Sequence, residues 1–229
     1  MILRPIINAL FPPRCLGCNA ILRAGGAACA ACLANVPHHR TLFCGRCRSR
    51  LPDGRKICHP AFPYRLGAAA DYDTALVRAL IHGLKFERIR EAAIPLAECL
   101  NAYADELPLP RVNLIAVPIP LGRRRERERG FNQAGLIGAA FAAHRRCPLL
   151  DDVLIRTRDT DPQSARERLE DRWGNVRGCF TVARPEPIAK RTVVLIDDVT
   201  TSGATFFEAA TVLKRAGARS VIALAVAKA

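Results

Sequence analysis

The segment that most constrains the fold of this chain is 191–205, which reads RTVVLIDDVTTSGAT. Residues 192–196 are all β-branched or leucine, a composition typical of a parallel strand that is buried on both faces. We expect this strand to end in two adjacent carboxylates, Asp197 and Asp198, and to be followed by a polar turn and a helix over 206–216. A strand, an acid pair, a hydroxyl-rich turn and a helix, in this order, predict a site for a phosphorylated sugar.

The polar turn is suited to a phosphate group. The start of a helix offers unpaired N–H groups and the positive end of the helix dipole. Gly203 allows a close approach of the backbone, and the hydroxyls of the turn can donate hydrogen bonds to phosphate oxygens. Because carboxylates repel phosphate, we assign the acid pair to ribose hydroxyls or to a hydrated Mg²⁺, on a turn at the protein surface. The alternative is an ordinary buried strand that ends in a solvated Asp-Asp turn.

Val193–Thr205 resembles the thirteen-residue signature for phosphoribosyl pyrophosphate (PRPP) of type I phosphoribosyltransferases. The match comprises four apolar residues, two acids, an apolar residue and a threonine–glycine turn, although Ala204 stands where glycine or serine is commoner. The resemblance implies that Asp197 and Asp198 hold the ribose hydroxyls as the catalytic pair. It also implies that the following residues bind PRPP through its 5′-phosphate: Val199, Thr200, Thr201, Ser202, Gly203, Ala204 and Thr205.

Seven of the ten cysteines fall between residues 15 and 58. Pairs of cysteines two residues apart are typical of structural zinc sites, in which four ligands form a tetrahedron. The first four, Cys15, Cys18, Cys29 and Cys32, predict a complete structural Zn²⁺ site. The second set, Cys44, Cys47 and Cys58, lacks a fourth cysteine, because Ala61 stands at the expected spacing. His59 adjoins Cys58, which makes joint ligation by the two awkward but not impossible.

The alternative for these cysteines is a set of extracellular disulfides. The opening residues 1–11 resemble a signal peptide only weakly, since their apolar run is short and is broken by Pro5. We therefore interpret them as a short helix in a cytoplasmic protein without a membrane span. A (double) zinc ribbon over 1–62 and an α/β domain over 63–229 are the expected domains.

A second informative segment is 122–133, GRRRERERGFNQ, which has five arginines in seven positions. It follows an expected strand over 112–117, so we predict an anion-binding loop before a helix over 132–143. The alternative is a solvated turn in which Glu126 and Glu128 pair with neighbouring arginines. By resemblance to PRPP enzymes, this region is the pyrophosphate loop, with Pro118, Ile119 and Arg129 as its binding residues. The polar segment 159–175 is expected to be a mobile loop over the site.

The remaining pattern is that of an α/β protein. We expect further strands over 66–72, 153–158, 176–182 and 220–227, and further helices over 73–84 and 94–107.

Three further motifs resemble the ComF/GntX family. They are HGLKF at 82–86, VPIP followed by RGFNQ, and the run that starts RTRDTDPQ at 156. The resemblance implies a type I phosphoribosyltransferase fold, a Rossmann-like parallel sheet with flanking helices, preceded by a small double zinc ribbon. It further implies PRPP binding with Mg²⁺ and an association with competence and DNA uptake.

Two functions from different classes follow. In the first, a nitrogen acceptor, whose identity is left open, displaces pyrophosphate from PRPP, although no residue is an evident general base. In the second, the chain is a non-catalytic PRPP sensor that binds single-stranded DNA and competence or DNA-processing proteins. The net charge of +14 favours a polyanionic partner. Few aromatic side chains are available to stack on bases, since only Phe43 and Phe62 lie near the ribbon.

Overall fold

The computed structural model describes residues 12–51, 58–158 and 176–229. The helix expected over 1–11 and the mobile loop expected over 159–175 lie outside the described residues.

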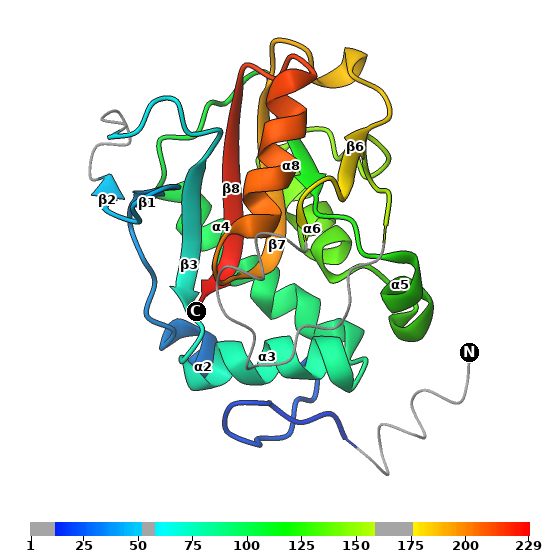
Figure 1. The fold of residues 1–229 in the computed structure, drawn as a ribbon. Coiled ribbons are helices and arrows are strands. Elements are labelled where there is room, and N and C mark those ends of the chain that lie inside the picture. Colours follow the sequence, from blue (N-terminus) through cyan, green and yellow to red (C-terminus); the bar gives the residue numbers. More distant parts are fainter. Residues whose placement is uncertain (1–11, 52–57, 159–175) are drawn as a thin grey trace.

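A six-stranded sheet forms the centre of the molecule (Figure 1). In spatial order its strands are β2 (Arg50–Leu51), β1 (Leu42–Cys44), β3 (Arg65–Asp71), β8 (Ser220–Lys228), β7 (Thr192–Thr200) and β4 (Leu114–Pro118). The last four strands of this order are parallel to one another, whereas β1 pairs antiparallel with both β2 and β3. The mixed α/β fold with a mostly parallel sheet therefore agrees with the prediction, while its assignment to type I phosphoribosyltransferases stays an expectation.

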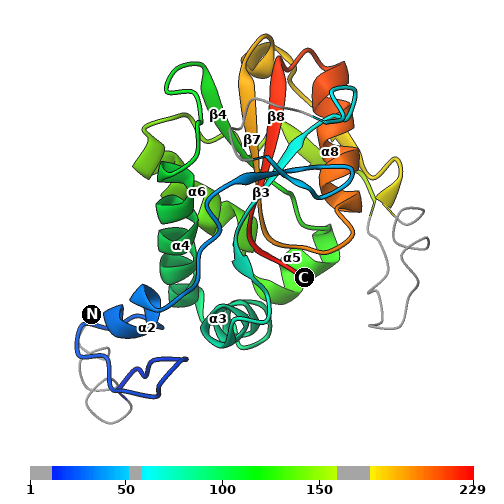
Figure 2. The same ribbon diagram turned by 90° about the vertical axis from the view of Figure 1, so that its left-hand side faces the viewer.

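Helices cover both faces of this sheet (Figures 1 and 2). On one face, α3 (Ala75–Phe86), α4 (Ala93–Asp105) and α6 (Gln133–Arg145) share one hydrophobic core with Val194 and Ile196 of β7, and α6 contacts β7 directly. On the other face, α8 (Ala204–Arg215) packs against Val193 and Leu195. This alternation follows from the two-residue period of a strand, and it explains why the whole run of β7 is apolar.

The smaller elements connect these layers. They are α2 (Ala30–Ala34), η1 (Arg90–Ala92), α5 (Arg123–Arg129), the hairpin-like pair β5 (Leu154–Arg156) and β6 (Phe180–Val182), and η2 (Glu186–Ile188). No helix in the described ranges is long and apolar enough to cross a lipid bilayer.

Three expectations about local structure are wrong. Strand β7 does not end at the acid pair but continues to Thr200, because Asp197, Val199 and Thr200 remain paired with β8. The arginine-rich segment 123–129 is a short helix rather than a loop, capped at its end by Gly130 in the left-handed region. The strand expected over 176–182 is confined to β6.

Candidate functional site

The candidate site lies where the parallel strands β4 and β7 end side by side. Pro118 is level with Ile196, and the Ile119 N–H donates to the Ile196 carbonyl over 2.9 Å. The Ile119 carbonyl in turn accepts a hydrogen bond from Asn132 Nδ2 at 3.0 Å. Both backbone groups of Ile119 are thus used within the protein, and its side chain is buried. Ile119 therefore has no free polar group with which it could bind pyrophosphate as predicted.

Asp198 is buried, with 5% of its surface exposed, so the expectation of a surface position is wrong. Side chains alternate between the two faces of a strand, so the Asp198 side chain lies on the same face of β7 as Val194 and Ile196 and faces α3. There Lys85 Nζ lies 2.9 Å from Asp198 Oδ2 and forms an ion pair with it. The charge of Asp198 is thus balanced within the protein.

Asp197 faces the opposite side of β7, toward α8, and is only half-buried. Its Oδ1 accepts a hydrogen bond from the Asp198 N–H at 2.8 Å. Burial, followed by repulsion from the Asp198 carboxylate, raises the pKa of Asp197 to about 8, against the opposing effect of Lys85. With a pKa of about 8, the carboxyl group of Asp197 exists in both its protonated and its ionised form near neutral pH, so it can exchange a proton with a ligand.

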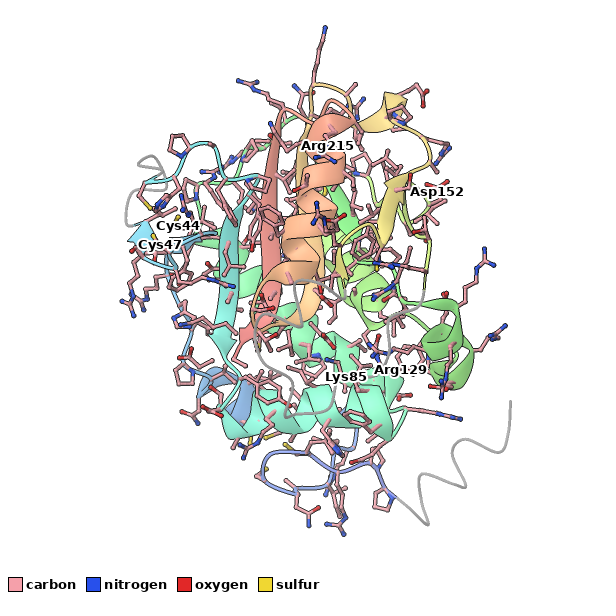
Figure 3. The ribbon with its side chains drawn as sticks, in the orientation of Figure 1. Cys44, Cys47, Lys85, Arg129, Asp152 and Arg215 are labelled. Atoms are coloured by element: carbon pink, nitrogen blue, oxygen red, sulfur yellow. The ribbon has the colours of Figure 1, made fainter. Side chains whose placement is uncertain are left out.

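Arg129 is the arginine of α5 whose charge acts on the acid pair, and its guanidinium lies over the Phe86 ring, 6.0 Å from the ring centroid. Its guanidinium is half-buried; burial lowers the pKa of Arg129, and Asp198 and Asp197 oppose that effect. Figure 3 shows Arg129 and Lys85 at the same end of β7, reached from α5 and α3. Elsewhere in the helix, Arg124 Nε pairs with Glu128 Oε1 at 2.9 Å, which is the local pairing that the alternative interpretation expected. The site therefore holds two cations beside two carboxylates.

The predicted phosphate turn lies between β7 and α8. Gly203 has φ +79°, a left-handed conformation that other residues rarely adopt, and it caps α8. The first turn of α8 carries no acidic residue that would repel an anion. The Ser202 hydroxyl accepts a hydrogen bond from the Ala204 N–H at 3.4 Å. Among the described residues, none hydrogen-bonds to the buried hydroxyl of Thr200, so this turn retains an unused polar group.

Two residues from outside the turn hold its backbone carbonyls. Arg48 Nη2 donates to the Thr201 carbonyl at 3.3 Å, and the Tyr64 hydroxyl donates to the Gly203 carbonyl at 3.4 Å. Burial raises the pKa of Tyr64 to about 12, so its hydroxyl stays a donor at neutral pH. A side chain at position 203 would place its Cβ 2.6 Å from Arg48 Nη2 and 2.7 Å from Tyr64 Oη. The cysteine-rich region thus contacts the turn directly.

The first four cysteines form a metal-binding geometry. Their sulfur atoms all lie within 4.8 Å of one another, and Cys18 Sγ and Cys29 Sγ are 3.7 Å apart. A tetrahedral Zn²⁺ with Zn–S bonds of about 2.3 Å requires sulfurs roughly 3.8 Å apart. Although burial opposes it, hydrogen bonds from the backbone N–H groups of neighbouring residues lower the pKa of Cys15 to about 6. Contact with Cys29 and Cys18 raises the pKa of Cys32 to about 12.

The second set of cysteines gains its fourth ligand from His59. Cys44 Sγ lies 3.4 Å from His59 Nδ1, and Cys47 Sγ lies 3.4 Å from Cys58 Sγ. These four ligand atoms are also within 4.8 Å of one another, so ligation by the adjacent Cys58 and His59 is geometrically compatible. The second site is therefore of the Cys₃His type, which Zn²⁺ commonly occupies.

Sequence reasoning missed three residues of this arrangement: Arg48, Tyr64 and Lys85. A signal existed for one of them, because the run HGLKF at the end of α3 is unusually polar, which points to Lys85. Arg48 and Tyr64 had no signal, because their roles depend on the packing of the second cysteine site against α8.

Comparisons with known proteins support the zinc-ribbon interpretation of the cysteine-rich region and find relatives over most of the chain. The family model "Double zinc ribbon domain" matches residues 6–61. DNA utilization protein YhgH of Escherichia coli (strain K12) is 34% identical over 224 residues, which cover 92% of this chain and 94% of that protein. Competence protein F of Haemophilus influenzae is 26% identical over 230 residues, or 94% of this chain and 97% of that protein. Competence protein ComFC of Bacillus subtilis is 30% identical over 132 residues, or 55% of this chain and 51% of that protein.

Proposed function

Because this chain belongs to the ComF/GntX family, together with DNA utilization protein YhgH and competence protein F, we propose that it binds PRPP with Mg²⁺ at the end of β7. The observation that carries this proposal is the convergence of three groups at one sheet edge. They are the Asp197–Asp198 pair, the Gly203 turn at the start of α8, and the cations Lys85 and Arg129. Each group matches one part of PRPP.

The 5′-phosphate would lie at the turn, where N–H groups of α8 and hydroxyl groups provide donors. The ribose hydroxyls would lie at the acid pair, with the half-buried Asp197 as the more accessible acceptor. The pyrophosphate would lie toward Arg129, whose guanidinium can bind phosphate oxygens. Mg²⁺ would arrive with PRPP and neutralise the pyrophosphate as it leaves.

The transfer reaction that suits this arrangement is substitution at C1 of the ribose. The C1–O bond breaks with its electron pair going to pyrophosphate, and the lone pair of a nitrogen acceptor forms the new C1–N bond. The proton that the nitrogen loses passes to Asp197 when this residue is in its ionised form, and the raised pKa makes that carboxylate a stronger base. The acceptor is a nitrogen nucleophile in the context of DNA uptake and competence.

A calorimetric titration with PRPP, with and without Mg²⁺, tests the binding step. We expect Mg²⁺-dependent binding that Asp198→Asn weakens at least tenfold, because Lys85 then loses its charge partner and the ion pair no longer fixes the acid pair beside the ribose. The matched control Asp151→Asn removes an exposed carboxylate from another part of the chain and should bind as the wild type does. Equal affinity of Asp198→Asn and wild type would refute the assignment.

Release of pyrophosphate tests the chemistry separately. Incubation of the wild type with PRPP and a series of nitrogen acceptors should give acceptor-dependent pyrophosphate. Binding of PRPP without release under any of these conditions would favour the sensor role.

A second candidate function is single-stranded DNA binding. The net charge of +14 supports it, as do the names of the relatives, DNA utilization protein and competence protein. In this role PRPP would be a signal rather than a substrate, and the DNA would need a surface of its own.

A further inference from the structure

A hollow of about 650 Å³ opens between the second cysteine site and the outer face of α8. Three cationic side chains line it, Arg46, Lys214 and Arg215. Among the residues that the structure describes, its lining contains no carboxylate. The hollow is therefore electrostatically suited to an anionic ligand.

Two aromatic rings form part of its wall. The Phe62 and Phe207 rings have their centroids 5.2 Å apart and are tilted by 46°. Both side chains pack against the core on the α8 side of the sheet, yet both remain partly exposed. A Cβ at Gly45 would lie 2.6 Å from Phe62 Cε1, so the Phe62 ring rests directly on the backbone of the second cysteine site. The fold thus brings a second aromatic side chain to the region, which the sequence did not predict.

The three cationic side chains differ in their availability to a ligand. Lys214 Nζ donates to the carbonyls of Ala218 and Arg219 at 3.1 and 2.7 Å, so it is engaged within the protein. Arg46 and Arg215 are exposed on opposite walls, one in the cysteine site and one in the last turn of α8. Figure 3 shows Arg215 at the end of α8 remote from Lys85. These two arginines are the groups that can contact phosphates.

A neighbouring hollow of about 600 Å³ shares Phe207, Thr211 and Arg215 and adds Arg177. It contains one carboxylate, Glu208, which accepts a hydrogen bond from the Gly178 N–H at 2.7 Å. The two hollows together flank the exposed ridge of α8. A chain of alternating rings and phosphates fits such an arrangement better than a single small molecule does.

We propose that these two hollows form a groove for single-stranded DNA, with bases against Phe62 and Phe207 and phosphates against Arg46 and Arg215. The proposal rests on the DNA-binding function proposed above and gives it a location. A single strand is favoured over a duplex, because only unpaired bases can present their faces to half-buried rings. The lack of a carboxylate in the first hollow disfavours a basic peptide.

This groove is separate from the proposed PRPP site. Gly203 and Arg215 stand at opposite ends of α8, which at 1.5 Å per residue places them about 18 Å apart. DNA and PRPP should therefore bind without competing.

The test is a fluorescence anisotropy titration of labelled oligo-dT with the full zinc-loaded chain at several salt concentrations. We expect Arg46→Ala/Arg215→Ala to weaken binding about tenfold at 0.1 M salt and to lower the salt slope by about 1.4, since each phosphate contact on a single strand contributes about 0.7. The control Arg23→Ala/Arg111→Ala removes the same charge from exposed positions elsewhere and should leave the slope unchanged. Phe207→Leu, which keeps an apolar side chain on the core, should weaken binding several-fold without changing the slope.

Three results would overturn the proposal. An equal loss in the control variant would show that net charge alone attracts DNA. If the wild type binds oligo-dT and both groove variants bind it equally well, the protein binds DNA at another surface. No binding of oligo-dT by the wild type at low salt would remove the function together with the groove. Saturating PRPP with Mg²⁺ should leave the affinity for oligo-dT unchanged.

Discussion

At the residue scale, the two adjacent carboxylates have different environments although their sequence context is the same. Asp198 faces α3 and pairs with Lys85, whereas Asp197 faces the other side of the strand and has an elevated pKa. The difference follows from the alternation of side chains along β7, which continues through both residues. One carboxylate is therefore fixed by the protein and the other is available to a ligand or a proton.

The raised pKa of Asp197 predicts a pH dependence of stability. Its folded value of about 8 lies above the value of about 3.9 expected in the unfolded chain. Between these values the folded chain holds the extra proton, so the free energy of unfolding falls as pH rises from about 4 to about 8 and then levels off. Asp197→Asn should remove this fall. The slope of the fall is smaller than the roughly 1.4 kcal/mol per pH unit expected for the release of one whole proton, because Asp197 is only half-buried.

Urea unfolding of wild type and Asp197→Asn from pH 5 to 9, without Mg²⁺, measures this difference. The variant should be the more stable protein at pH 9. Parallel pH profiles for the two proteins would contradict the assignment.

His59 predicts the metal content. With His59 completing the second site, the wild type should contain two zinc ions per chain and His59→Ala only one tightly bound ion. Elemental analysis after dialysis measures the ratio. His82→Ala, which changes an exposed histidine in α3, is the control and should keep both ions. A content of one in the wild type would show that Cys44, Cys47, Cys58 and His59 do not hold zinc.

At the scale of elements, the second cysteine site supports the turn between β7 and α8. Arg48 has φ +62° and follows directly on the Cys44–Cys47 pair, and its guanidinium reaches the Thr201 carbonyl. Because Arg48 and Tyr64 donate hydrogen bonds to the Thr201 and Gly203 carbonyls, the turn is fixed before any ligand binds. Such preorganisation lowers the entropic cost of binding.

Replacement of Arg48 should therefore affect PRPP binding. Arg48→Met keeps the bulk of the side chain but removes the donor, and it should weaken PRPP binding about fivefold, which corresponds to roughly 1 kcal/mol for one hydrogen bond. Arg50→Met, in the neighbouring strand β2, removes the same charge and should not.

Amide hydrogen exchange supplies a readout that does not need PRPP. Exchange at residues 203–205 should be faster in Arg48→Met than in Arg50→Met. Equal exchange and equal PRPP affinity in the two variants would show that the contact has no role in the turn.

Much of this architecture could be predicted from the sequence. The buried strand, its acid pair and the following helix are local patterns, and the Cys-x-x-Cys pairs have fixed spacing, so both could be located in advance. Contacts between distant segments could not. Arg48 with Thr201, Phe62 with Phe207 and Lys85 with Asp198 meet only because the sheet and its two cores bring them together. The helical state of 123–129 was missed because its alternating charges were interpreted as ligand-binding rather than as local ion pairs.

In the molecule as a whole, two surfaces carry exposed arginines that can bind phosphates. One is the groove beside α8, and the other is the helix α5. In α5, Arg123 and Arg127 line a shallow hollow of about 360 Å³ together with Glu126 and Gly130. Arg129, at the end of the same helix, acts on the acid pair through its charge. Helix α5 thus lies between the predicted pyrophosphate position and the outer surface.

Alanine at Arg123, Arg124 and Arg125 should show whether α5 adds phosphate contacts to those of the groove. We expect it to flatten the salt dependence of single-stranded DNA binding by about 0.7 for each phosphate contact that is lost. Fluorescence titrations at several salt concentrations measure the slope, with Arg23→Ala/Arg111→Ala/Arg191→Ala, at three exposed positions, as the control for the loss of charge. An unchanged slope would leave the groove as the surface that contacts DNA.

The pairing of β1 with β3 has a consequence for attempts to shorten the protein. Phe43 and Cys44 pair with Leu66 and Arg65, and the His39 N–H donates to the Ala69 carbonyl. A chain that began at residue 63 would leave one side of β3 unpaired, in a strand whose residues 66–70 are all buried. An open apolar edge of this kind favours strand-to-strand association between molecules. The cysteine-rich region therefore protects the sheet against aggregation, and the α/β part should be insoluble when it is expressed without it.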